Sequence, residues 1–550
     1  MKTICKSLFT HCLTGVLSLV VAASFATTLL AQSAPQPAVV ISVAPIKEQM
    51  NDINYLVDTS GFGQAKFLIK SQIRYVTGGL DNKRPSGALL YFEGDNPEPT
   101  TVAFLPIKDI DDLLDTLSDM VEVDEEGDLI KIIPPNGETL FAREQGSHMF
   151  ITTDKNALAD LPAEPAAMLG DLPAKYNVGV HVFGDRVPEE LRQKAIDMIK
   201  EGYVDSLENL DIDPTEIDSK LAEFEEQIEV FEDLDEIVFG VLADKETHKL
   251  AMEFSITGKP GSKIAKGYAG LANAPPSRFL GFMNDGAAAD YTMCFDINTE
   301  DADRVGSQMD TLIESMMTEL DNDGELSEEE LDSIRSAAIQ ISEVIEETFK
   351  EGRVDSSGQL LMDENRLDFA AAGQVSDPAK IEAAVKELVE VAKKRDEDQI
   401  FEFNLDFAKH KGVTLHEIII NVPEDEEEVQ DVIGSEMALI LGIGEKEIYL
   451  ATGKSPLDTL KAAMDKEAGA APEYPIIYNL RVTPILEFAA KTSGQPVIDN
   501  LVEKLSEVGR DKMTVYSKAI ENGLFTRMEM EDGPIELIQS AIEEVGAPEF

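Results

Sequence analysis

Residues 437–465 read MALILGIGEKEIYLATGKSPLDTLKAAMD, and this stretch decides the predicted fold. Apolar residues crowd two short runs on either side of Gly444-Glu445-Lys446, which is the pattern of two strands joined by a tight turn. The apolar residues then change to helical spacing, at Leu457, Leu460 and Ala463. Ser455 suits the N-cap of that helix and Pro456 its first turn. The stretch therefore predicts a β-hairpin followed by a helix.

The same hairpin-and-helix pattern recurs along the chain, at 139–161, 248–271, 365–392 and 522–545. Larger blocks also align, because residues 139–270 correspond in order to 437–545, and a related block runs from 278 to 395 between them. Such internal similarity indicates a duplicated architecture. The predicted fold class is α+β, with repeated antiparallel hairpin-plus-helix modules and helical connectors at about 188–233, 301–350 and 483–510.

These patterns divide the chain into a signal peptide, two α+β regions and two modules between them. The predicted segments are a signal peptide at 1–33, an N-terminal α+β region at 34–175, a first module at 176–275, a second module at 276–395 whose helical connector carries an acidic loop, and a C-terminal α+β region with the third module at 396–550.

The N-terminal segment has the features of an export signal. Lys2 and Lys6 give it a positive start, and an uncharged apolar stretch extends to Ala31, with small residues near the predicted cleavage point. The alternative is an uncleaved anchor, but Gly15 and several Ser and Thr residues dilute the stretch. No later segment has 18 uncharged apolar residues. We therefore expect a protein exported to the periplasm or the cell exterior, without a membrane span after cleavage.

Charge and cysteine content restrict the partners of the 550-residue chain. It carries 105 Asp and Glu against 47 Lys and Arg, which gives a formal charge of −58. This excess repels phosphate backbones and anionic membrane surfaces, so nucleic acid is excluded as a partner. Cleavage removes Cys5 and Cys12 and leaves Cys294 in an apolar, strand-like run. A single thiol forms no internal disulfide, so we expect Cys294 to pack in the core.

With its acidic composition, export signal and recurring hairpins, the chain resembles large acidic exported bacterial proteins of uncharacterised function that share hairpin-helix repeats. The resemblance covers most of the mature chain. It implies an exported, non-cytoplasmic and non-catalytic protein.

Residues 319–330, ELDNDGELSEEE, resemble an EF-hand calcium loop between two helices. Calcium prefers six to eight oxygen ligands, and an EF-hand supplies them from loop positions 1, 3, 5, 7, 9 and 12, with Gly at position 6. Gly324 stands at position 6, and Glu stands at position 1 where the pattern has Asp. The predicted calcium ligands are Glu319, Asp321, Asp323, Glu325, Ser327 and Glu330.

The same residues also fit a second interpretation without a metal. Ser327 and Glu330 have the spacing of a capping box, in which each side chain bonds the backbone of the other residue at a helix start. EF-hands usually work in pairs, and the chain has no second good match. Both interpretations stay open at the level of sequence.

A search for catalytic motifs finds none. The five His residues outside 1–33 have no metal-binding spacing, and no GxSxG elbow or complete phosphate loop occurs. The leading prediction is therefore a non-enzymatic binding or scaffolding protein with an envelope or extracellular partner. The alternatives are a calcium-responsive protein that uses the 319–330 loop, and a hydrolase whose carboxylate site is hidden among the many acids.

Overall fold

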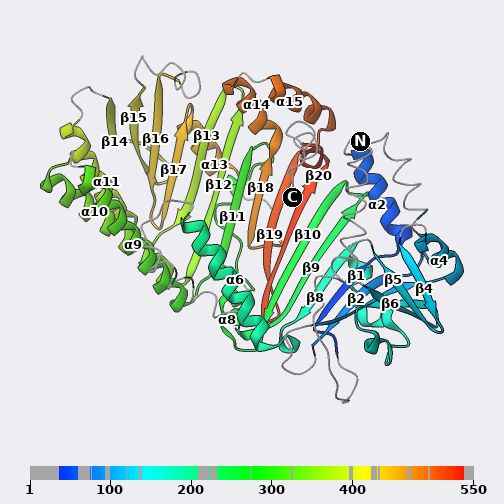
Figure 1. Cartoon of the computed structure of the whole chain (residues 1–550). Coiled ribbons are helices and arrows are strands. Elements are labelled where there is room, and N and C mark those ends of the chain that lie inside the picture. Colours follow the sequence, from blue (N-terminus) through cyan, green and yellow to red (C-terminus); the bar gives the residue numbers. More distant parts are fainter. Residues whose placement is uncertain are drawn as a thin grey trace. The chain divides into compact units, whose positions relative to one another are not determined.

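The chain has an α+β fold that divides into two compact units (Figure 1). The first unit comprises Met1–Ala265 with Glu521–Phe525, and the second comprises Lys266–Ile520 with Thr526–Phe550. The computed structural model describes residues 36–537 except 60–74, 76, 93–98, 119–120, 135–138, 209–220, 222–223, 225–231, 273, 324–325, 396–399, 423–429, 431–433, 468–471 and 494–495. The predicted signal peptide at 1–33 lies outside the described residues.

Ten strands of the first unit, counted within the described residues, pair in antiparallel fashion. They are β1 (Val39–Val43), β2 (Ser86–Tyr91), β3 (Thr100–Pro106), β4 (Glu122–Glu126), β5 (Leu129–Ile133), β6 (Leu140–Gln145), β7 (His148–Thr152), β8 (Val178–Phe183), β9 (Leu234–Asp244) and β10 (Lys249–Gly258). Their pairings give the order β4-β5-β6-β7-β3-β2-β1-β8-β9-β10. The strands β1 and β8, far apart in sequence, therefore lie side by side in the interior of this order.

Helices cover both faces of the β2–β7 part of this sheet. Helix α4 (Ile110–Ser118) buries Leu113 against Ala103, Ile130 and Ile132. On the opposite face, Leu158 of η2 (Lys155–Leu158), Leu169 of η3 (Pro165–Leu169) and Leu172 of α5 (Leu172–Lys175) pack on Val102, Phe104 and Phe150. The remaining helices are α2 (Ile46–Thr59), η4 (Gly184–Arg186), α6 (Glu189–Glu208) and α8 (Lys263–Ala269).

Among the described residues, another ten strands belong to the second unit, apart from residues 523–525 of the last strand. They are β11 (Ala289–Asp296), β12 (Arg353–Asp363), β13 (Arg366–Gln374), β14 (Phe401–His410), β15 (Val413–Asn421), β16 (Glu436–Ile443), β17 (Glu447–Gly453), β18 (Ile476–Arg481), β19 (Lys512–Ile520) and β20 (Gly523–Glu531). Their pairings give the order β14-β15-β16-β17-β13-β12-β11-β18-β19-β20. Adding ten to each strand number of the first order gives the second order.

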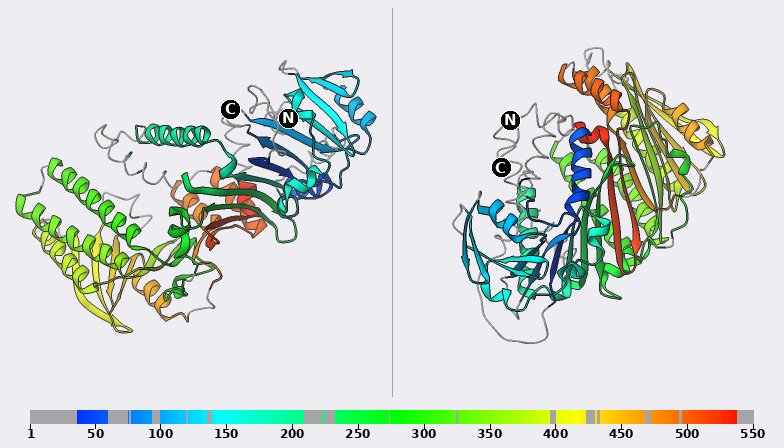
Figure 2. Two further views of the ribbon diagram at one scale, coloured as in Figure 1. Left: turned by 90° about the horizontal axis from the view of Figure 1, so that it is seen from below. Right: turned by 90° about the vertical axis from the view of Figure 1, so that its right-hand side faces the viewer.

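Helices also cover both faces of the β13–β17 part of the second sheet. Helices α9 (Thr299–Asp323), α10 (Glu328–Lys350) and α11 (Pro378–Arg395) lie side by side along the strands, and Figure 2 shows them in two further views. On the other face, η6 (Leu280–Phe282) and α13 (Pro456–Asp465) pack on Ala370, Leu415 and Ile440. Helices α14 (Val482–Ser493) and α15 (Pro496–Val508) follow β18.

The hairpin predicted at 437–465 is confirmed as β16, β17 and α13. Gly444 closes the turn by donating its N–H to the Glu447 carbonyl at 2.9 Å. Ser455 is the N-cap of α13 and Pro456 its first residue, but the Ser455 side chain makes no capping bond. Instead, the carboxylate of Asp368 on β13 accepts the Ser455 N–H at 2.8 Å, so the neighbouring strand caps this helix.

Candidate functional site

An apolar hollow of the second unit lies on one face of the strands. Its volume is about 330 Å³, and strands β11, β12, β13, β18 and β19 form it. Antiparallel register places Tyr291 beside Gly358 and Tyr478, and Tyr478 beside Val515, so their side chains share this face. The side chains directed to this face are those of Ala289, Tyr291, Leu360, Phe369, Tyr478, Leu480, Met513 and Val515.

Gly358 determines how the rings lie in this hollow. A Cβ atom at Gly358 would come within 2.6 Å of Tyr291 Cε1, so the Tyr291 ring lies over the bare backbone of β12. The Tyr291 hydroxyl is 3.2 Å from Ser356 Oγ, which anchors the far end of the ring. The Tyr478 ring follows at a centroid distance of 6.1 Å and an interplanar angle of 24°. The two tyrosine rings are therefore nearly parallel, and we call this pair the tyrosine platform.

The tyrosine platform is open to solvent and is bordered by uncharged side chains. Tyr478 is 43% exposed and Leu480 is 37% exposed, which is high for large apolar residues in a central strand. Asp290 and Asn479 also border the hollow, but they alternate with Tyr291 and Tyr478 along their strands, so their side chains point to the opposite face. Partial burial raises the pKa of the Tyr478 hydroxyl, so it is neutral at physiological pH.

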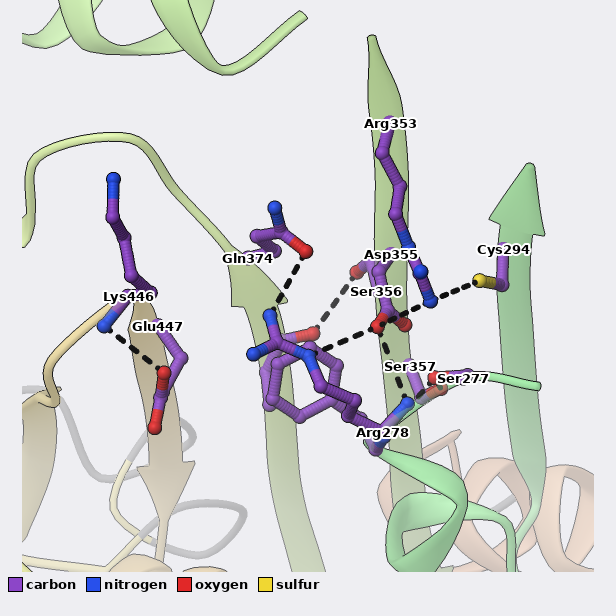
Figure 3. A network of polar contacts seen from close by, with 12 residues as sticks. Ser277, Arg278, Cys294, Arg353, Asp355, Ser356, Ser357, Gln374, Lys446 and Glu447 are labelled. Atoms are coloured by element: carbon purple, nitrogen blue, oxygen red, sulfur yellow. Dashed lines mark hydrogen bonds and ion pairs between the residues drawn. The ribbon is translucent and has the colours of Figure 1, made fainter. Parts of the chain in front are cut away.

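A network of polar side chains occupies the opposite face of the same strands (Figure 3). At its centre, the buried Asp355 carboxylate accepts the backbone N–H of Arg278 at 3.2 Å and lies 3.5 Å from Arg353 Nη2. The same Arg353 nitrogen donates to Cys294 Sγ at 3.2 Å. Burial raises the pKa of the Cys294 thiol, so Cys294 is an inert packing residue, as its position in an apolar run predicts.

A second hollow, of about 510 Å³, lies on the first unit beside α2, α5 and β9. Asn177 fixes its wall, because Asn177 Nδ2 donates to Asp52 Oδ2 at 2.6 Å and Asn177 Oδ1 accepts the Ala243 N–H at 2.7 Å. Burial raises the pKa of Asp52, and the bond from Asn177 opposes that rise. These contacts hold α2 to the sheet, so we assign them a structural role.

The described residues among those predicted to bind calcium lie at the end of one helix and at the start of the next. Glu319 and Asp321 are in the last turns of α9, which continues to Asp323. Gly324 and Glu325 lie outside the described residues. Ser327 and Glu330 start α10, where Glu330 Oε2 accepts the Ser327 N–H at 2.8 Å and its hydroxyl at 2.6 Å. The capping box is therefore confirmed, and calcium binding stays a prediction.

Within the described residues, one set of carboxylate and imidazole atoms is close enough to be considered as metal ligands. Glu382 of α11, Asp406 of β14 and His416 of β15 have ligand atoms within 4.8 Å of one another. A metal-bound imidazole uses one nitrogen for the metal and donates the N–H of the other nitrogen.

The hydrogen bonds of His416 do not fit that requirement. His416 Nδ1 accepts the Asp406 backbone N–H at 3.1 Å, so this nitrogen carries no hydrogen, and the neutral ring holds its hydrogen on Nε2. Lys386 Nζ is also in place as a cation, 2.5 Å from Glu382 Oε1 and 3.6 Å from Asp406 Oδ2. The set is therefore better explained as a hydrogen-bonded cluster than as a metal centre.

Sequence analysis identified neither the tyrosine platform nor the His416 cluster. Tyr291 and Tyr478 are 187 residues apart, and only the pairing of β11 with β18 brings them together. The spacing of the three cluster residues matches no ligand motif, because each comes from a different element. The local signal that was present is Gly358, a glycine in the middle of a strand, which often marks close approach of another group to the backbone.

Comparisons with known proteins assign no family to the chain. No family model matches it, and no curated protein matches it. A solved structure, crystal form I of TP0453, is similar over 41% of this chain and 79% of its own chain, with 9% identity and a TM-score of 0.19. A TM-score this low carries no argument about fold or function. In the described part of the chain, no helix combines the length and apolar composition that a membrane crossing needs.

Proposed function

We propose that the protein is an exported, non-enzymatic binding protein whose second unit holds an uncharged, flat apolar ligand on the tyrosine platform. The observation that carries this proposal is the hollow of about 330 Å³, which is lined by apolar side chains and floored by Gly358. Its volume lies at the lower end of small-molecule sites, which hold about 300–1,000 Å³.

The chemistry of the hollow favours a neutral ligand with an aromatic or ring-shaped body. Tyrosine rings bind flat apolar groups by stacking, which adds to the gain from burying apolar area. The side chains directed to this face are uncharged, so a charged group would lose its hydration without gaining a partner. The formal charge of −58 adds a general repulsion of anions.

We also infer that the two units derive from an internal duplication of a scaffold built from hairpin-plus-helix modules. Support comes from the identical strand order and from helices at matching places, such as α4 after β3 and α11 after β13. In this scheme the block at 276–395 corresponds to β1–β3 with α4, so it begins the second copy. An experimental structure in which β8–β10 and β18–β20 fail to superpose would contradict the inference.

Two fluorescent probes that share one aromatic body test the proposed ligand class. N-phenyl-1-naphthylamine is uncharged, whereas 8-anilinonaphthalene-1-sulfonate adds a sulfonate. We expect saturable binding of the neutral probe, at least about tenfold tighter than binding of the anionic probe. Tyr478→Ala should weaken neutral-probe binding by about tenfold, because removing one stacked ring costs about 1.4 kcal/mol.

The matched control is Leu450→Ala, which removes an apolar side chain of similar exposure from the same sheet face outside the hollow. This variant should bind both probes as the wild type does. Equal loss in Tyr478→Ala and Leu450→Ala would show general adsorption to apolar surface, and the proposed site would be wrong.

The proposed export has its own test. N-terminal sequencing of protein recovered from outside the cytoplasm should show a chain that lacks residues 1–33. Recovery of the full-length N-terminus in a membrane fraction would support the alternative of an uncleaved anchor.

A further inference from the structure

An irregular bulge interrupts strand β14 opposite His416. Asn404 pairs with Glu417 and Ala408 pairs with Leu415, so three residues of β14 face the single His416 of β15. In the middle of the bulge, Asp406 adopts a φ of 55°, a left-handed conformation that few residues other than Gly adopt. A local contact is needed to hold such a conformation in one place.

That contact is the hydrogen bond from the Asp406 backbone N–H to His416 Nδ1, at 3.1 Å. The His416 side chain is only 2% exposed, so water does not compete for the bond. The bond exists only while Nδ1 carries no hydrogen, which means while the imidazole is neutral. The conformation of the bulge is thus linked to the protonation of one histidine.

The groups around His416 provide a second arrangement for the charged ring. Glu382 Oε1 of α11 lies 3.5 Å from Nε2, and Asp406 Oδ1 of β14 lies 4.0 Å from Nδ1. Lys386 of α11 contacts both carboxylates and opposes the charged state, and the register partner on β16 is the uncharged Leu441. Burial lowers the pKa of His416, and the two carboxylates oppose that effect.

We propose that His416 is an acid-sensitive latch that fixes the bulge of strand β14 at neutral pH and releases it on protonation. A proton added to Nδ1 occupies the lone pair that accepted the Asp406 N–H. The backbone bond is then lost, and the new Nδ1–H turns toward the Asp406 carboxylate. The bulge of strand β14 thus changes its local backbone structure, while β15 keeps its pairing with β16.

Hydrogen–deuterium exchange of the whole mature protein, corrected for the intrinsic pH dependence of exchange, tests this proposal. We expect protection of the peptide at 401–410 to fall by about tenfold per pH unit once the pH is below the pKa of His416. Protection of β17 in the same molecule should stay constant. His416→Asn keeps an oxygen acceptor near the Nδ1 position and does not titrate, so its 401–410 peptide should be insensitive to pH.

Two further variants keep the test decisive. His410→Asn alters a different histidine, which lies on β14 and bonds Asp465 at 2.9 Å, and it should leave the pH response unchanged. If His416→Asn fails to fold, Asp406→Gly replaces it, because Gly adopts positive φ without the latch and should retain protection at pH 5. The same pH response in the wild type and in either of the two latch variants would overturn the proposal.

Discussion

Buried aspartates of the described chain are held mainly by arginines. Asp355, Asp368, Asp511 and Asp532 each contact an arginine, whereas Asp290 is bonded by Asn479. In two of these pairs the arginine and the aspartate are two residues apart on the same strand: Arg353 and Asp355 on β12, and Arg366 and Asp368 on β13. Side chains two residues apart on a strand point to the same face. Sequence alone did not select them from 105 acids, because their burial depends on η6 and α13.

Removal of the Asp368 carboxylate should destabilise the second unit. Asp368 bonds Arg366 at 2.7 Å, the Ser455 N–H at 2.8 Å and the Thr459 hydroxyl at 3.3 Å. Asp368→Ala leaves a helix start without its cap and a buried hydroxyl without its acceptor, so we expect a loss of about 2 kcal/mol in the free energy of unfolding. Urea denaturation measures it. Asp458→Asn, at an exposed site on α13, should change stability by less than about 0.5 kcal/mol.

Asp290 should make the protein less stable as the pH rises. It is 6% exposed, and burial raises its pKa in the folded state, while the bond from Asn479 at 2.7 Å opposes that rise. The folded state therefore binds a proton more tightly than the unfolded chain, so this stability is present below the ordinary Asp pKa and is lost as the pH rises through the folded-state value.

The variant Asp290→Asn isolates this effect, because it keeps the oxygen that accepts from Asn479 and cannot ionise. We expect it to be more stable than the wild type at pH 7, with the difference shrinking toward pH 4. Thermal unfolding across this pH range measures the difference. A difference that is the same at every pH would contradict the assignment.

At the scale of elements, the start of α10 separates the two interpretations of the acidic loop. Ser327→Ala removes a confirmed N-cap, so we expect a loss of about 1 kcal/mol in the free energy of unfolding with or without calcium. The calcium prediction adds a separate expectation, namely saturable heat of calcium binding that Asp323→Ala abolishes. Isothermal titration of the chelator-treated protein measures it. Small, salt-sensitive heat that is equal in the wild type and in Asp323→Ala would rule out the calcium site and leave the capping-box interpretation.

Helices and strands whose apolar residues follow a clear periodic spacing were predictable from the sequence. The elements against which they pack or pair were not. The hairpins and the helical connectors follow from apolar spacing, and α9, α10, α14 and α15 lie within the ranges predicted for connectors or overlap them. The bulge in β14 was not predicted, although Asn404 and Asp406 are residue types that are uncommon in strands, because such residues also occur in regular exposed strands. Its cause lies on β15 and α11, which contribute His416 and Glu382.

At the scale of the molecule, the sequence predicted a repeated architecture, but it did not predict the matching order of all the strands. The sequence alignment of 139–270 with 437–545 matches strands β6–β10 to strands β16–β20. Strands β1–β5 were left in a general α+β region, because β4 reads EVDEE, which has no apolar alternation, and because Ala and Gly weaken the pattern of β2. The tyrosine platform depends on the pairing of β11 with β18, which are far apart in the sequence. The platform was therefore not predictable from the sequence either.

The large acidic excess should make stability depend on salt. With a formal charge of −58, folding brings many like charges together, and counterions screen their repulsion. We expect the Tm to rise by a few degrees between 10 mM and 150 mM NaCl and to change little above that. A calorimetric scan at each concentration measures the rise. A Tm that climbs evenly to molar salt would indicate a general surface-exclusion effect instead of screening.

The terminal strands β4 and β14 have a consequence for how readily the protein aggregates. An unpaired strand edge is a template onto which other chains can add and aggregate. Strand β4 carries four acids in five residues, and β14 is broken by its bulge, so each is a poor template. Charge on β4 and irregular backbone in β14 thus oppose fibre-like association at these two strands.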